Sequence, residues 1–241
     1  MSHLQELADR LRDDIVERYS LTEVGDPYEP LVLTSSGEQV GAVRVWTGAK
    51  IPTFIDSRLV IPAMGVDSTQ FHAFARSDTA VPHLGSDVAG IGGRLSFNVD
   101  LTPRVDLSVE PGYLDGVYAP LSEARAAAYA IDGAVPVDLP LRLLAFSSPW
   151  ITGVTVGEEA VPEIEKVYRV YIERFYDLID QGAPRLATDI DLVERDRAHR
   201  RAQFDPSSDA VWDFLAGLLG QSSVDAILTL VRNPGPPAAR S

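Results

Sequence analysis

The feature of this sequence that most restricts its fold is a change of hydrophobic period near residue 110. Between about residues 31 and 109, apolar and polar side chains alternate in short runs, at 41–46, 58–61, 70–75 and 94–100, with Gly, Pro, Ser and Asp between them. This alternation is typical of half-buried β-strands. Because no crossover helix fits between the runs, we expect an antiparallel meander and not a parallel, doubly wound sheet.

Helical periodicity dominates the rest of the chain. At the N-terminus Leu4, Leu7, Leu11 and Ile15 recur at three- and four-residue steps and predict one amphipathic helix. Further helices are predicted over 113–131, 158–182, 188–203, 209–219 and 222–232, whereas the uncharged run 143–157 is interpreted as core followed by a turn. The sequence therefore predicts an α/β fold, a three-layer α/β/α sandwich with a central antiparallel sheet flanked by helices. We expect one domain over 1–232 and a flexible Pro-rich tail over 233–241.

Composition excludes several classes of function. The 241 residues include no cysteine, which excludes disulfides, cysteine-ligated zinc and cysteine-ligated iron–sulfur clusters. There are 35 Asp and Glu against 21 Lys and Arg, and this formal net charge of −14 argues against a general nucleic-acid-binding protein. No run is apolar enough to span a membrane, and the acidic N-terminal segment does not resemble a signal peptide. We expect a cytoplasmic protein.

Two of the predicted strands have one polar face. In a strand over 70–75, His72 shares a face with Phe74 and Arg76, and in a strand over 94–100 Ser96 and Asn98 lie opposite an apolar face. If the two strands are neighbours, their polar faces together form the floor of a ligand pocket. The alternative is that this face of the sheet is simply solvated.

Asp87 lies in a segment that is bounded by Gly85, Gly90, Gly92 and Gly93. These glycines precede a predicted strand, whereas the glycines of a phosphate-binding loop follow a strand and begin a helix. We therefore interpret the segment as a place of close backbone approach, or a bulge that directs Asp87. From sequence alone, a role in a turn is the commoner explanation for such an aspartate.

The predicted helix over 188–203 contains a charged cluster. On a helical wheel Asp196 and His199 lie near Leu192 and are neighbours of each other, so both are expected to lean inward. The arginines are expected to point outward, although a fully solvated charged helix is the simpler alternative. Four of them fall within seven positions: Arg195, Arg197, Arg200 and Arg201. The four dispersed histidines of the chain lack the spacing of metal ligands, so we expect no metal site.

Several of these stretches together resemble the ferredoxin-dependent bilin reductases and their relative, red chlorophyll catabolite reductase. The similar stretches are 71–72, 82–87, 92–104 and 195–212, and they occur in the order typical of that family over about residues 30–232. The stretch 105–118 looks more like the chlorophyll catabolite branch. The resemblance thus leaves open whether the substrate is a bilin or a chlorophyll catabolite.

The resemblance implies a function and a mechanism. The family's α/β/α sandwich reduces an open-chain tetrapyrrole with single electrons from ferredoxin, and the reductase itself binds no metal or flavin. Carried over to this sequence, the catalytic residues are Asp87, His72 and Asp196: His72 contacts the substrate and orients or protonates it, Asp87 delivers a proton, and Asp196 is a second acid. Each electron makes the conjugated substrate more basic, so a buried carboxyl with a raised pKa suits the role of proton donor.

Further contacts are expected from the same comparison. The expected substrate-binding residues are Phe74, Arg76, Arg94, Ser96, Asn98, Arg142 and His199, and the three arginines among them suit propionate groups. Ferredoxins are acidic, so the expected docking surface is the basic cluster of Arg195, Arg197, Arg200 and Arg201. Two alternatives remain open: a non-catalytic tetrapyrrole-binding protein, and an enzyme of this fold that acts on an unrelated conjugated substrate.

Overall fold

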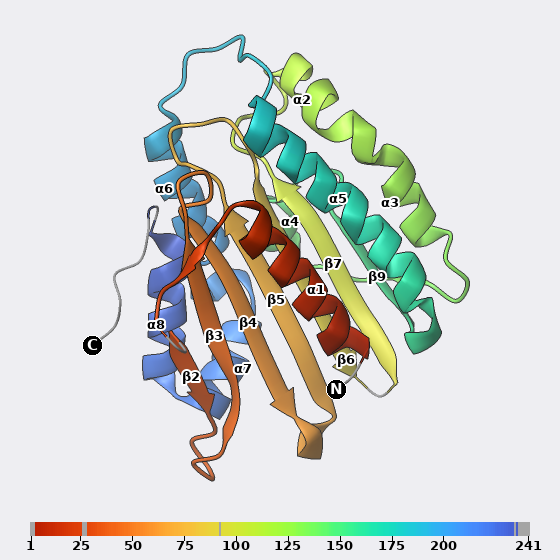
Figure 1. The fold of residues 1–241 in the computed structure, drawn as a ribbon, viewed down its shortest axis with the longest axis vertical. Helices are drawn as coiled ribbons and strands as arrows, with labels where there is room; N and C mark the ends of the chain where they lie inside the picture. The colour runs from red at the N-terminus through yellow and green to blue at the C-terminus, as the bar shows by residue number, and fades with distance from the viewer. Residues whose placement is uncertain (1–2, 26–27, 92, 234, 236–241) are drawn as a thin grey trace.

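The alternating part of the sequence forms an antiparallel meander at the centre of the molecule (Figure 1). In the computed structural model, which describes residues 3–25, 28–91, 93–233 and 235, five long strands pair in chain order. They are β3 (Gln39–Thr47), β4 (Thr53–Ile61), β5 (Val66–Phe74), β6 (His83–Ile91) and β7 (Arg94–Thr102). Their order confirms the predicted meander.

Four shorter strands complete a nine-stranded sheet within the described residues. On one side, β1 (Thr22–Glu23) and β2 (Glu29–Val32) both pair with β3. On the other side, β9 (Thr152–Gly157) pairs with β7, and β8 (Val135–Pro136) pairs with β9. All of these pairings are antiparallel, but the order β7-β9-β8 is not sequential, so the chain crosses from β7 to β8 through the segment 103–134 before it returns to β9.

Two segments differ from the sequence-based expectation. Asp87 was expected in a loop or bulge but lies in the middle of β6, and the expected turn at the end of 143–157 is strand β9. Strand β6 has few residues with high β-propensity, but it hydrogen-bonds to β5 on one side and β7 on the other. This double pairing overrides the weak local preference. Most of the predicted tail, at 234 and 236–241, lies outside the described residues.

One helical layer covers the face of the sheet that is nearer the viewer in Figure 1. Its helices are α1 (His3–Arg18), α2 (Pro111–Tyr118), α3 (Ser122–Tyr129) and α5 (Val161–Gln181). The predicted single helix over 113–131 is divided by a 3-10 turn, Ala119–Leu121, that contains Pro120. Leu7, Leu11 and Ile15 of α1 are buried in the same core as Val167 and Phe175 of α5, as their spacing predicts.

The other face carries α6 (Leu192–Gln203), α7 (Val211–Leu219) and α8 (Gln221–Arg232). Helix α6 begins later than predicted because the side chain of Asp191 accepts a hydrogen bond from the backbone N–H of Glu194 and caps the helix there. The apolar core on this face involves strands β2 to β5 only. Over β5 to β7 this face carries groups other than the apolar core, and the candidate site lies in this region.

None of the helices in the described part of the chain is both long and apolar enough to cross a membrane.

Close contact between β3 and β4 predicts a strong effect of one small substitution. A Cβ atom added at Gly41 would lie 1.9 Å from the carbonyl oxygen of Arg58 on the neighbouring strand. We expect Gly41→Ala to lower the free energy of unfolding by about 2 kcal/mol, because the backbone must shift. Gly217→Ala is the matched control: nothing lies within 4 Å of an added Cβ in helix α7, so the change should be neutral or stabilising by up to about 1 kcal/mol. Urea denaturation measures both, and equal effects would contradict the register described here.

Candidate functional site

A cavity of about 290 Å³ lies between the sheet and the second helical layer. Its floor consists of side chains from β4, β5, β6 and β7 that point away from the α5 core: Ile55, Ser57, Gln70, His72, Asp87, Ser96, Asn98, Asp100 and Thr102. Its walls and roof come from the segment 137–151 and from helices α6 to α8: Leu139, Leu143, Phe204, Asp209, Trp212, Ile227 and Val231. The floor is polar and the roof mostly apolar, an arrangement common in small-molecule sites.

Strand register places the polar floor residues in two rows. Gln70, Asp87 and Asn98 are cross-strand partners in one row, and His72, Gly85 and Asp100 are partners in the next. Gly85 has no side chain, and a Cβ added there would lie 3.6 Å from Nδ1 of His72. The floor is therefore open between His72 and Asp100. Polar residues of β5 and β7 thus line one cavity, with the correction that β6 lies between these two strands, which were expected to be neighbours.

Asp87 has the electrostatic character of a proton donor. The pKa of its carboxyl is raised to about 7. Burial is the main cause, the negative charge of Asp209 acts in the same direction, and a hydrogen bond from Gln70 opposes the shift. The side chain remains partly accessible because it lines the cavity. Near neutral pH this carboxyl can therefore both hold and release a proton.

His72 is a neutral imidazole at neutral pH. Burial and the charge of Arg200 lower its pKa to about 4. Its ring stacks on Phe74, with ring centres 5.8 Å apart, and meets the edge of Phe204 at 5.4 Å. These aromatic neighbours fix the ring plane. The group is thus suited to hydrogen bonding with a ligand and not to carrying a positive charge.

Asp100 is a second acid of the cavity that sequence reasoning did not select. Its two carboxylate oxygens accept hydrogen bonds from the Ser148 side chain at 2.5 Å and the Ser148 backbone N–H at 2.9 Å. Burial raises its pKa to about 7 in spite of these bonds. The alternation of strand β7 put Asp100 on the same face as Ser96 and Asn98, so the pattern that identified those residues also pointed to Asp100.

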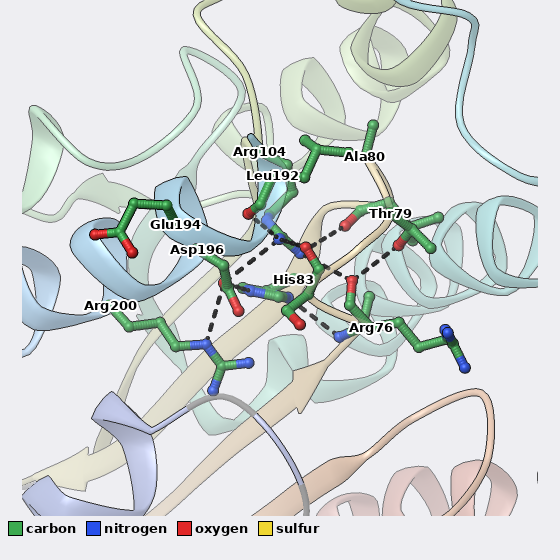
Figure 2. Close-up of polar contacts among 12 residues, drawn as sticks. Arg76, Thr79, Ala80, His83, Arg104, Leu192, Glu194, Asp196 and Arg200 are labelled. Atoms are coloured by element: carbon green, nitrogen blue, oxygen red, sulfur yellow. Dashed lines mark hydrogen bonds and ion pairs between the residues drawn. The ribbon is translucent and has the colours of Figure 1, made fainter. Parts of the chain in front are cut away.

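Asp196 lies behind the cavity in a buried ionic network (Figure 2). Its Oδ1 atom accepts a hydrogen bond from Nε2 of His83 at 2.7 Å and another from Nε of Arg200 at 3.2 Å. A nitrogen of Arg104 lies 3.6 Å from the same oxygen. Asp196 is 1% exposed and both arginines are 2% exposed. Sequence reasoning predicted that Asp196 leans inward, which is confirmed, but not these partners.

The network fixes the protonation of both members of the His83–Asp196 pair. Nδ1 of His83 accepts a hydrogen bond from the backbone N–H of Ala75 at 3.1 Å, so the proton of the neutral ring is on Nε2, facing Asp196. Burial and the charge of Arg104 hold the pKa of His83 well below its usual value. Burial alone would raise the pKa of Asp196, but the bond from His83 and the charges of Arg200 and Arg104 hold it well below its usual range. Asp196 is therefore an ionised carboxylate.

The network is connected to His72 through Phe74. The guanidinium of Arg200 lies 3.7 Å from the centre of the Phe74 ring, and Phe74 stacks on His72. The ring of His83 packs edge-on against Phe74, with ring centres 5.1 Å apart. Phe74 was expected to contact substrate, but it is buried next to His72 on strand β5 and is not among the cavity-lining residues.

Of the remaining residues that were expected to bind substrate, the structure places some in the cavity lining and others outside it. Ser96 and Asn98 line the cavity, as predicted. His199 lies in a neighbouring groove, where its Nε2 donates to the carbonyl of Phe146 at 3.2 Å. Asp196 and His199, both expected at the ligand, are thus outside the cavity lining.

The arginines that were expected to bind propionates also lie outside the cavity lining. Arg76 forms an exposed ion pair with Asp78 in the turn after β5, at 2.6 Å. Arg94, the first residue of β7, donates hydrogen bonds to two backbone carbonyls of other segments. Arg142 lies near the rim and donates to Ser207 at 2.8 Å. Arg200 was expected in an exposed docking patch, which is wrong, because its pairing with Asp196 buries it.

Comparison with known proteins establishes the fold. No protein-family model matches the chain, and no curated protein matches its sequence. Among solved structures, selenomethionine-labelled phytochromobilin synthase from tomato in complex with biliverdin is similar, with a TM-score of 0.68 and 15% sequence identity. The match covers 95% of this chain and 85% of that one. The resemblance expected from the sequence motifs is thereby confirmed at the level of the fold.

The buried network predicts an asymmetric response to loss of charge on helix α6. Asp196→Asn leaves Arg104 and Arg200 buried without their counter-ion and should lower the free energy of unfolding by about 3–5 kcal/mol in urea at pH 7. Glu194→Gln, on the same helix, removes an exposed pair with Arg197 and should cost less than about 1 kcal/mol. Comparable losses in the two variants would show that the network contributes no more than a surface pair.

The raised pKa of Asp87 predicts a pH-dependent gain of stability when the carboxyl is removed. The folded-state pKa of about 7 is above the unfolded value, so the contribution of this group is full below about pH 4 and is lost as the pH rises through 7. Relative to the unmodified protein, Asp87→Asn should therefore gain about 2 to 3 kcal/mol between pH 5 and pH 8. Asp132→Asn, at an exposed turn, is the control and should show no such trend in denaturant titrations. A flat difference for Asp87→Asn would refute the assignment.

Proposed function

We propose that this protein reduces a linear tetrapyrrole, either a bilin or a chlorophyll catabolite, in the cavity above strands β5 to β7. The observation that carries the proposal is the pairing of a protonatable Asp87 with a neutral His72 on a cavity floor. The fold adds support, since it is shared with phytochromobilin synthase, which was solved in complex with biliverdin. The family resemblance of the motifs around 71–104 points to the same activity.

The chemistry requires protons as well as electrons. Reduction of one carbon–carbon double bond by two single electrons takes up two protons, and each added electron makes the conjugated substrate more basic. Asp87 donates a proton from its carboxyl to the reduced substrate, and its pKa of about 7 suits this exchange near neutral pH. Asp100, on the far side of Gly85, is the candidate for the second proton. Both carboxyls regain protons from water at the cavity mouth.

His72 and Asp196 have supporting roles in this proposal. His72 orients the substrate by hydrogen bonding as a neutral imidazole, because its pKa of about 4 leaves it uncharged in use. Asp196 was expected to be a second proton donor. Its ionised carboxylate carries no proton at neutral pH, so we assign it instead to positioning His72 through Arg200 and Phe74.

An external ferredoxin is the proposed electron donor. The chain has no cysteine to ligate its own iron–sulfur cluster, so electrons have to reach the substrate from another carrier if no other redox group is bound. The basic surface proposed for docking is reduced to Arg195, Arg197 and Arg201, since Arg200 is buried. An acidic carrier is complementary to this surface, although Arg197 already pairs with Glu194.

The size of the cavity favours one competing function. A volume of about 290 Å³ is at the lower end for a small-molecule site, so a four-ring substrate requires the roof over 137–147 to move outward. A smaller conjugated substrate fits without this movement. An enzyme of the same fold acting on such a compound is therefore the second candidate.

Anaerobic spectroscopy with biliverdin tests the proposal. Binding should shift the absorption of biliverdin, and reduced ferredoxin should then bleach or shift it in steps. Asp87→Asn should bind biliverdin with a Kd within about threefold of the unmodified protein but reduce it at least about 100-fold more slowly. Asp132→Asn, outside the cavity, should match the unmodified protein in both measurements.

Three other outcomes contradict parts of the proposal. Full turnover by Asp87→Asn would remove Asp87 as the proton donor. Binding without reduction, with either ferredoxin or a small viologen donor, would identify a tetrapyrrole carrier. Failure of every linear tetrapyrrole to bind would favour the smaller conjugated substrate.

A further inference from the structure

The cavity contains charge of one sign only. Its lining includes four aspartates and, within the described part of the chain, neither lysine nor arginine: Asp87, Asp100, Asp138 and Asp209. Asp138 lies in the roof segment, and Asp209 lies at the beginning of helix α7, where it accepts a hydrogen bond from the backbone N–H of Val211 at 2.9 Å. Asp87 and Asp209 both line this cavity, one from the floor and one from the side of the helices.

The nearest guanidinium groups are already engaged by the protein. At the rim, Arg142 donates to Ser207 and lies close to Asp205, whose pKa is lowered by hydrogen bonds from Ser207 and by the charge of Arg142. Beside the cavity, on the same face of the sheet, Arg200 pairs with Asp196 and lies against the Phe74 ring. The buried group of Arg104, Arg200 and Asp196 carries a net positive charge of one, which does not balance the acids of the cavity.

The rest of the cavity suits an uncharged ring system. Leu139, Leu143, Phe204, Trp212 and Ile227 provide apolar contact, and the floor provides neutral hydrogen-bonding groups. A carboxylate taken into this space loses its water and meets charges of its own sign, and both effects are unfavourable. A neutral ester in the same position avoids both penalties.

We propose that the site selects tetrapyrroles whose peripheral carboxyl groups are neutralised, as esters or amides, over free dicarboxylic acids. This inference rests on the proposed function and specifies the substrate class within it. Asp138 and Asp209 are the residues that discriminate, since both line the cavity and neither donates a proton in the proposed reduction, although the charge of Asp209 acts on the pKa of Asp87. The selection is electrostatic exclusion, and it requires no dedicated contact to the ester group.

Biliverdin and its dimethyl ester provide a matched pair of probes with the same chromophore. Binding is followed by quenching of Trp212, which lines the cavity, and Trp212→Phe shows how much of the signal arises there. At low salt the diester should bind about tenfold more tightly than the diacid, the effect of two like charges within several ångströms. Raising the salt concentration should narrow the ratio by improving the affinity for the diacid.

A double variant separates charge exclusion from simple preference for an apolar ligand. Asp138→Asn with Asp209→Asn should tighten diacid binding about tenfold and leave the Kd of the diester unchanged. Asn at 209 can still accept the bond from Val211, so the helix start is preserved. Asp115→Asn with Asp132→Asn makes the same change in net charge at exposed positions outside the cavity and should leave the ratio as it was.

The failure of this inference is distinguishable from the failure of the proposed function. Equal or tighter binding of the diacid, or diacid binding that weakens as salt rises, would overturn the inference and leave the tetrapyrrole function standing. An unchanged ligand ratio in the Asp138 and Asp209 double variant would also overturn it. If neither probe binds, the proposed function itself fails.

Discussion

The face of the sheet that carries helices α6 to α8 depends on the hydrogen bonds and ion pairs of one carboxylate, that of Asp196. Its Oδ1 atom joins His83 of strand β6 to Arg200 of helix α6, and Arg104, which follows β7, is close by. A carboxylate without water is stable only with such partners, so three elements are fixed around one atom. Arg200 in turn contacts the ring of Phe74, which stacks on His72, the candidate ligand-binding histidine. The shape of the cavity floor thus follows from an ion pair outside the cavity.

Strand register determines which chemical groups meet in the cavity. Side chains alternate between the two faces, so the pairing of β5, β6 and β7 sends one set into the α5 core and the other into the cavity. A slip of one residue would exchange the two sets and place carboxyls in the apolar core. The helices of the second layer contribute mainly apolar walls. The candidate proton donors, Asp87 and Asp100, therefore both lie on the sheet.

The sequence was sufficient for the meander, the helices and one polar face of β5 and β7, because their apolar residues allow a single orientation. His72 was therefore placed on the polar face of its strand. The residue pattern around Asp87 predicted a loop or bulge instead of a strand, because β6 is held by its two neighbours and shows no pattern of its own. The helical wheel for 188–203 predicted that Asp196 points inward and that Arg200 points outward. In the structure Arg200 is buried as well, because it pairs with the buried carboxylate of Asp196. His83 lies 113 residues from Asp196, and no local pattern reports a contact over such a separation.

The two acids of the cavity floor determine which protonation states the site can adopt. Burial raises the pKa of both Asp87 and Asp100 to about 7, so each carboxyl gains or loses its proton close to neutral pH. At the same position, a ligand that enters the cavity can therefore meet either a neutral hydrogen-bond donor or a negative charge. A modest change of pH changes the chemical surface of the cavity without any movement of the backbone.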